Sequence, residues 1–261
     1  MCENCGCSGH HHAHAHDHNH AHNGEHAHVR PDGSIYYHTH DEKATREIAL
    51  GQAILSANDR IAAENRNWFK ERDLLVFNLI SSPGAGKTTL LTQTLKKLQE
   101  HNISAAVIVG DQYGSLDAEV MRSTGVPVTQ IETQSSCHLD AGRVQEVLAA
   151  AVPEGTRILF IENVGNLVCP VAFDLGENAK IALLSTPEGE EKPLKYPALF
   201  AAAELVLLSK SDLADILEWN YQMCVDNIKQ VNADAQIMRI AAKNGKDLDH
   251  WIDFLLKKLQ K

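Results

Sequence analysis

Short runs of consecutive apolar residues alternate with amphipathic stretches along most of this 261-residue chain. The runs have the length of strands and lie between helical patterns, such as residues 88–101 and 139–152. The predicted strands span residues 74–80, 104–110, 126–132, 157–163, 180–186, 204–210 and 236–241. Strands that are apolar throughout and separated by helices are typical of a mostly parallel sheet covered on both faces. The pattern therefore predicts a doubly wound α/β domain over residues 74–261.

A long helix is predicted ahead of this domain, over residues 42–73. Apolar residues recur in it as pairs seven positions apart, a spacing that two helical turns bring to one face. The stripe consists of Ile48 and the pairs Ile54–Leu55, Ile61–Ala62 and Trp68–Phe69. We expect this stripe to pack against the following domain.

The first forty residues have a different composition, since they hold twelve of the chain's fifteen histidines together with three of its six cysteines. Almost nothing in this segment can pack, so burial cannot offset the entropy cost of ordering it. We predict that residues 1–41 form a disordered, metal-binding Cys/His-rich tail. An expression tag is disfavoured, because tags are uninterrupted histidine runs and carry no C-x-x-C-G-C ahead of them.

Charge and composition narrow the class of partner. The net charge is -10 and no segment forms a dominant basic patch, which disfavours nucleic acid as a partner. The start lacks a basic segment followed by an apolar core, and no stretch approaches the roughly twenty apolar residues needed to cross a bilayer. We therefore expect no membrane partner and a cytoplasmic location, where thiols stay reduced and available to metals.

A phosphate-binding sequence follows the first predicted strand. In SSPGAGKTTLL, Gly86, Lys87 and Thr88 match the P-loop pattern, whereas Ser81 occupies the place of its first glycine. Lys87 is expected to reach the β- and γ-phosphates, and the Thr88 hydroxyl to bind Mg²⁺. The predicted phosphate-binding residues are Gly84, Ala85, Gly86, Lys87, Thr88 and Thr89. The alternative, a glycine-rich turn without a ligand, is disfavoured by the strand before it and the helix after it.

The sequence SKSDL, residues 209–213, indicates the preferred base. It resembles the N-K-x-D guanine-recognition sequence, with Ser209 in place of Asn. The Asp212 carboxylate can accept from both the ring N–H and the exocyclic amine of guanine, and adenine lacks this pair of donors. The stem of Lys210 can cover the face of the base. Taken alone, the tetrapeptide could equally be a helix N-cap; its place behind a P-loop and a strand favours guanine.

Acidic residues at strand ends complete the predicted nucleotide site. Asp111 ends the strand after the P-loop helix, and Glu162 takes the aspartate place of a D-x-x-G-like sequence that ends at Gly165. Either carboxylate is a candidate Mg²⁺ ligand, and with Lys87 they are the candidate catalytic groups. Gly165 is expected to sense the γ-phosphate, whereas Asp117 fits better as a charge at a helix N-terminus. The sequence offers no obvious arginine finger or catalytic glutamine, so we predict slow intrinsic turnover.

Three further residues in this domain have the chemistry of soft-metal ligands. Cys137 and His138 adjoin on a predicted loop, and Cys169 lies just beyond the Glu162–Gly165 sequence. Thiolates and an imidazole suit zinc or nickel. Three ligands leave a coordination position open, or leave the site to be completed across a symmetric dimer interface. Each cysteine taken singly would be read as a buried packing residue, the role we assign to Cys224.

Seven motifs occur together and in order: C-x-x-C-G-C, a His-rich segment, SSPGAGKTTLL, GDQYGSLDAEV, CHLDAG, ENVGNLVCP and SKSDL. Over essentially the whole chain the sequence resembles the HypB family of GTPases, which help to insert nickel into nickel–iron hydrogenase. The resemblance implies a tight nickel site at Cys2, Cys5 and Cys7. It also implies a second nickel or zinc site at Cys137, His138 and Cys169, coupled to GTP-dependent formation of a homodimer. Ser209 stands where the family usually has Asn.

The resemblance also implies a function and partners. The chain would be a GTP-hydrolysing nickel metallochaperone that delivers nickel to the hydrogenase large-subunit precursor, and a HypA-type zinc/nickel accessory protein would assist it. Its tail would store nickel. Alternatives are a urease-type nickel GTPase, which would be expected to carry a Cys-Pro-His motif, a passive metal-storage protein, and an ATP-driven P-loop protein.

Overall fold

The computed structural model describes residues 25–29, 34–112 and 116–260 of the chain. The chain divides into two compact units, residues 1–57 and residues 58–261. The predicted ligands Cys2, Cys5 and Cys7 lie outside the described residues. No helix of the described part is long and apolar enough to span a bilayer.

The first unit contains a two-stranded antiparallel hairpin. Strand β1 (Glu25–Val29) pairs with β2 (Ile35–Thr39), in a register that places Glu25 opposite Thr39. The hairpin falls within residues 1–41, which the sequence predicts to be disordered. A hairpin of two strands is marginally stable on its own in water, because it has no second layer against which to bury a face.

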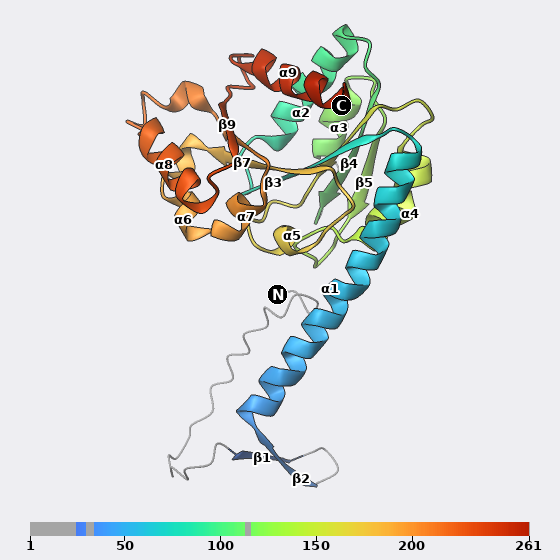
Figure 1. Ribbon diagram of the computed structural model, residues 1–261, viewed down its shortest axis with the longest axis vertical. Helices are drawn as coiled ribbons and strands as arrows, with labels where there is room; N and C mark the ends of the chain where they lie inside the picture. The colour runs from blue at the N-terminus through green and yellow to red at the C-terminus, as the bar shows by residue number, and fades with distance from the viewer. Residues whose placement is uncertain (1–24, 30–33, 113–115, 261) are drawn as a thin grey trace. The chain divides into compact units, whose positions relative to one another are not determined.

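The second unit is built on a seven-stranded sheet in which every neighbouring pair is parallel, in the order β5-β4-β6-β3-β7-β8-β9 (Figure 1). Its strands are β3 (Leu75–Ser81), β4 (Ala105–Asp111), β5 (Val128–Glu132), β6 (Ile158–Glu162), β7 (Ala179–Ser185), β8 (Leu205–Ser209) and β9 (Gln236–Arg239). Each begins and ends within two residues of a predicted run. The predicted doubly wound α/β fold is confirmed.

Helices cover both faces of this sheet (Figure 1). They are α1 (His40–Glu71), α2 (Lys87–Glu100), α3 (Leu116–Arg122), α4 (Ala141–Ala151), α5 (Cys169–Ala172), α6 (Lys192–Lys195), α7 (Pro197–Ala202), α8 (Tyr221–Val231) and α9 (Leu248–Leu259), with single 3₁₀ turns η1 (Thr186–Glu188) and η2 (Ser211–Leu213). One face packs against α2, α3 and α9. The other packs against α4 and the end of α1 on one half of the sheet, and against α7 and α8 on the other half.

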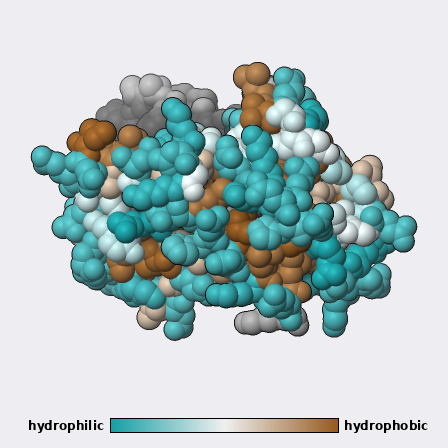
Figure 2. Space-filling view, turned by 90° about the horizontal axis from the view of Figure 1, so that it is seen from above, coloured by the Kyte–Doolittle hydropathy of each residue, from teal (hydrophilic) through white to brown (hydrophobic). Residues whose placement is uncertain are grey.

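Burial on both faces explains why the strands are apolar at consecutive positions. In β6, Ile158 and Phe160 pack on the α2 and α9 side, whereas Leu159 and Ile161 pack on the α4 side. On the surface, by contrast, Figure 2 shows hydrophobic residues in separate patches among hydrophilic ones. Cys224 is fully buried in α8, as predicted.

The buried face of α1 differs in part from the predicted stripe. Within residues 58–71 it consists of Asn58, Ala62, Asn65 and Phe69. Ala62 and Phe69 were predicted, whereas the two asparagines were not. Ile54, predicted to lie in the stripe, is 36% exposed. The difference arises because this face of the helix contacts the backbone of loops, which offers hydrogen-bonding groups, as well as apolar side chains.

Candidate functional site: a nucleotide cleft beside a cysteine–histidine cluster

The loop between β3 and α2 has the conformation of a phosphate-binding loop. Gly84 and Gly86 have φ angles of 72° and 101°, in the left-handed region that favours glycine. Helix α2 begins at Lys87, whose Nζ donates to Ser81 Oγ at 3.0 Å. Ser81, which replaces the first glycine of the pattern, thus holds the lysine amine at the end of the strand.

Glu162 lies at the end of β6, against the start of α2. Thr88 Oγ1 donates to Glu162 Oε1 at 2.9 Å, while Glu162 Oε2 is buried and has no hydrogen-bond partner among the described residues. Burial raises the pKa of Glu162 to about 7, against the opposing effects of Lys87 and of the Thr88 hydrogen bond. Burial likewise lowers the pKa of Lys87, although nearby carboxylates oppose this shift. The site therefore contains a buried acid and a buried base whose charges an incoming phosphate and cation would compensate.

The residues present fit a magnesium ion. Thr88 and Glu162 supply a hydroxyl and a carboxylate, the hard oxygen ligands that Mg²⁺ prefers. Asp111, at the end of β4, lines the same pocket of about 460 Å³ and is partly exposed. Asp117 also lines this pocket; it lies in the first turn of α3, as expected for a charge at a helix N-terminus. The unpartnered Glu162 Oε2 is the atom that most favours a cation here.

Gly165 packs directly on the phosphate-binding loop. A Cβ at this position would lie 2.9 Å from Pro83 Cα, closer than real Cβ contacts occur. Only glycine therefore allows the segment after β6 to approach the loop between β3 and α2. The two segments expected to sense the nucleotide are thus in backbone contact.

A second pocket, of about 640 Å³, adjoins the phosphate loop on its other side. Lys210 and Asp212 line it, and both pockets share Gly86 and Thr89. Ser209 Oγ donates to Ala85 O at 2.6 Å, and the Lys210 carbonyl accepts from Thr186 Oγ1 at 2.9 Å. Asp212 is exposed on the pocket wall. The predicted phosphate and base residues therefore line two adjoining pockets, together called the nucleotide cleft, and Ser209 joins the segment that carries Lys210 and Asp212 to the phosphate loop.

The structure brings Cys137, His138 and Cys169 together. One potential ligand atom from each lies within 4.8 Å of the others. His138 is buried and stacks on Phe173, with ring centroids 3.9 Å apart. Burial lowers the pKa of His138, which favours the neutral imidazole that binds metals. Two thiols and a neutral imidazole form a donor set that suits nickel or zinc.

Local capping interactions position these ligands. Asp140 caps α4, accepting from the Arg143 amide at 2.9 Å, which fixes the turn after His138. Asn166 Oδ1 accepts from the Val168 and Cys169 amides at 2.7 and 3.2 Å. Both cysteines are therefore held on short, hydrogen-bonded segments at the carboxyl ends of β5 and β6.

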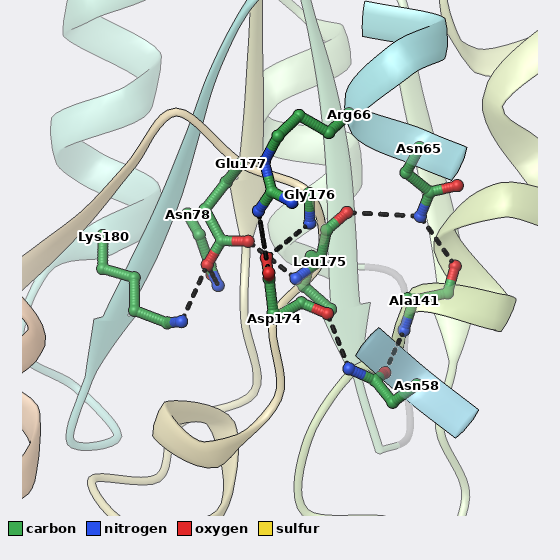
Figure 3. A network of polar contacts seen from close by, with 10 residues as sticks. All are labelled: Asn58, Asn65, Arg66, Asn78, Ala141, Asp174, Leu175, Gly176, Glu177 and Lys180. Carbon is green, nitrogen blue, oxygen red and sulfur yellow. Dashed lines mark hydrogen bonds and ion pairs between the residues drawn. The ribbon is translucent and has the colours of Figure 1, made fainter. Parts of the chain in front are cut away.

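Two asparagines of α1 hydrogen-bond to the start of α4 and to the loop before β7 (Figure 3). Asn58 accepts from the Ala141 amide at 2.9 Å and donates to Asp174 O at 2.8 Å. Asn65 Nδ2 donates to Ala141 O at 3.0 Å and to Leu175 O at 3.2 Å. Figure 3 shows both side chains directed toward the start of α4 and the loop before β7.

Sequence reasoning missed these asparagines, and it also missed Asn78 and Asn163. Asn78 interrupts an otherwise apolar strand, and Asn163 directly follows Glu162; both are buried. A polar residue inside an apolar run was the available signal, because buried polar groups require partners.

The chain is similar to known proteins in both sequence and fold. A family model described as "CobW/HypB/UreG, nucleotide-binding domain" matches residues 75–239. The "Hydrogenase maturation factor HypB" of Azotobacter chroococcum mcd 1 is 48% identical, with 81% of this chain and 69% of the relative covered. The factor of the same name from Cupriavidus necator is 39% identical, with 98% and 88% covered. A crystal structure of HypB from Helicobacter pylori in complex with nickel aligns at a TM-score of 0.74 and 36% identity, covering 78% of this chain and 95% of that one.

Proposed function

Because this chain belongs to the HypB family of hydrogenase maturation factors, within the CobW/HypB/UreG group of nucleotide-binding proteins, we propose that it is a GTP-hydrolysing nickel metallochaperone. One observation carries the proposal: the short segment after β6 joins the nucleotide cleft to the Cys137–His138–Cys169 cluster. Glu162 lies at the start of this segment and Cys169 at its end. A change at the phosphates therefore has a short covalent route to a metal ligand.

The nucleotide chemistry uses residues that line the cleft. Lys87 binds the β- and γ-phosphates, and Asp212 selects guanine over adenine. Thr88 and Glu162 would hold Mg²⁺, and Asp111 would be a further carboxylate ligand. Bound there, Mg²⁺ neutralises charge that develops on the phosphate oxygens. Turnover is slow, so a kcat of many per second for the isolated protein would contradict this part of the proposal.

The metal chemistry uses two sets of ligands. The cluster in the second unit binds nickel, its cargo, or zinc, and GTP-dependent homodimerisation alters its affinity. Cys2, Cys5 and Cys7 form a tighter N-terminal nickel site, and the histidines of the tail store nickel. We expect a HypA-type accessory protein and the hydrogenase large-subunit precursor as partners, in the cytoplasm. The nickel complex of the Helicobacter pylori relative supports nickel as the cargo.

The test isolates the cluster from the tail. In a variant with Cys2, Cys5 and Cys7 changed to Ala, nickel affinity is measured with GDP and with a non-hydrolysable GTP analogue. We expect the two affinities to differ by about five- to 150-fold, the usual range of coupling between sites. Adding Cys169→Ser should remove this binding, whereas Cys224→Ala, at a buried cysteine outside the cluster, should not. Equal affinities in the two nucleotide states would refute the coupling.

A further inference from the structure

Asn163 is a buried hub between the nucleotide cleft and the loop that carries Cys137 and His138. Its side chain is 1% exposed. Asn163 Oδ1 accepts from the Leu139 amide at 3.1 Å and from the Val164 amide at 3.0 Å. Asn163 Nδ2 donates to Asn78 Oδ1 at 3.2 Å. Both polar atoms of the side chain are therefore used, and one of the contacts spans from the β6 segment to the metal-ligand loop.

On the nucleotide side, the backbone around Asn163 is attached to the phosphate site. Its neighbour Glu162 accepts from Thr88 Oγ1. The Asn163 amide donates to Leu79 O, near the end of β3, at 3.1 Å. Two residues further on, Gly165 packs on Pro83. If Thr88 and Glu162 both held a nucleotide-bound cation, the ion would replace the direct hydrogen bond between them, and the position of the segment would depend on the bound nucleotide.

On the metal side, the contact reaches the residue next to His138. Leu139 is fully buried, and its side chain fills the space beside Gly110, where a Cβ would lie 2.6 Å from Leu139 Cγ. The loop is therefore tightly packed at Leu139, and it cannot move freely when the β6 segment moves. A displacement of Asn163 changes the hydrogen bond to Leu139, and Leu139 is covalently joined to a metal ligand.

The third contact anchors the hub to the sheet. Asn78 Nδ2 donates to Glu177 Oε1 at 3.1 Å, and Glu177 also contacts Lys180 Nζ at 3.1 Å (Figure 3). This branch leads to β7 and away from Cys137 and His138. Asn78→Ala is therefore a matched control, because it removes a buried hydrogen bond of Asn163 but leaves the contact of Asn163 with Leu139.

We infer that Asn163 is a positioning residue that transmits the nucleotide state to the Cys137–His138 loop through its hydrogen bond to the Leu139 amide. The inference rests on the proposed function, in which nucleotide and metal sites are coupled. The hydrogen bond adds a second route to the covalent one, which runs along the chain from Glu162 to Cys169. The nucleotide state thus acts on both halves of the cluster.

The experiment follows hydrogen exchange of the Leu139 amide in the full chain, freed of nickel and zinc and saturated with Mg²⁺ plus GDP or a non-hydrolysable GTP analogue. In the parent protein we expect exchange to differ between the two states by at least about fivefold. Asn163→Ala should abolish the difference. Asn163→Asp, whose carboxylate still accepts from the Leu139 amide, should keep it, and Asn78→Ala should keep it as well.

Three results would overturn the inference: no difference in the parent, a difference in Asn163→Ala as large as in the parent, or its loss in Asn163→Asp. If Asn163→Ala does not fold, the parent, Asn163→Asp and Asn78→Ala still decide the matter. Failure of the proposed function has a different signature. The cluster then binds no nickel in either nucleotide state, while the exchange difference at Leu139 and its dependence on Asn163 remain.

Discussion

At the scale of single residues, Glu162 shows how burial sets the chemistry of the cleft. Its carboxylate lies among a lysine amine, a hydroxyl and apolar strands, so removal from water outweighs the favourable contacts. Because its pKa is raised to about 7 in the folded protein, the folded state binds a proton that the unfolded state has released above pH 4.5. The raised pKa therefore makes folding stability depend on pH.

The first prediction concerns this dependence. As the pH rises from about 4.5 through 7, the nucleotide-free protein should lose stability at Glu162, because ionisation is easier in the unfolded chain. Glu162→Gln removes this titration, so its stability relative to the parent should rise over this range by up to about 3 kcal/mol. Urea unfolding of both proteins at several pH values measures the difference. Parallel pH profiles would contradict the prediction.

The second prediction concerns the base. Asp212→Asn should weaken GDP binding by about 10- to 100-fold, because an amide cannot accept from both guanine donors as the carboxylate does. ADP binding should change little. Asp215→Asn is the matched control, since Asp215 is exposed in the same segment and does not line the pocket. Calorimetric titration of each variant with GDP and with ADP measures the two affinities. Equal losses of GDP and ADP affinity would show that Asp212 acts on the structure of the loop and not on the base.

At the scale of elements, the end of α1 acts as a polar clamp. Its buried asparagines hydrogen-bond to the start of α4 and to the loop before β7, and both of these segments adjoin the cysteine–histidine cluster. Gly176 in that loop has a φ of 90°, and a Cβ there would lie 2.7 Å from Ala62 O. The close approach explains why the helix offers small or hydrogen-bonding side chains on this face.

The third prediction belongs to this clamp. Asn65→Ala should lower the free energy of unfolding by about 1–3 kcal/mol, because Ala141 O and Leu175 O lose a donor in a buried position. Asn67→Ala, on the exposed face of the same helix, should change it by less than about 0.5 kcal/mol. Chemical denaturation of the two variants provides the comparison. Similar losses would contradict the clamp, because alanine has the higher helix propensity at both positions and only Asn65 has the buried partners to lose.

At the scale of the whole molecule, the two proposed metal-binding regions fall in different units. Residues 58–261 contain both the nucleotide cleft and the cluster, whereas the predicted tail ligands belong to residues 1–57. If the protein only stores metal, the second unit has no role in releasing it. If the protein is a metallochaperone, the nucleotide bound to the second unit controls metal release.

The fourth prediction separates these interpretations. Deleting residues 1–41 should remove most of the bound nickel at saturation, while GDP affinity and nickel binding at the cluster persist. At ample nickel, hydrogenase maturation should largely survive. Equilibrium dialysis measures the first outcome and hydrogenase activity the second. If the deletion abolished hydrogenase maturation even at ample nickel, nickel delivery would depend on the tail.

The sequence determined most of the architecture, because the relevant information is local. Every strand of the large sheet was predicted, since each run is apolar for a contiguous stretch, and the phosphate loop was recognised because its residues are adjacent in the chain. The residues Cys137, His138 and Cys169 were also identified, and they were predicted to form one site.

The tertiary structure decided which of these residues meet. Cys137 follows β5 and Cys169 follows β6, and these strands are separated by β4 in the sheet, an order that no local pattern encodes. The contact from Asn163 to Leu139 likewise joins two strand ends. Such partners depend on strand order and register, which emerge only when the whole core packs. Local periodicity therefore determined the elements and the phosphate loop, and long-range packing assembled the metal cluster and its link to the nucleotide.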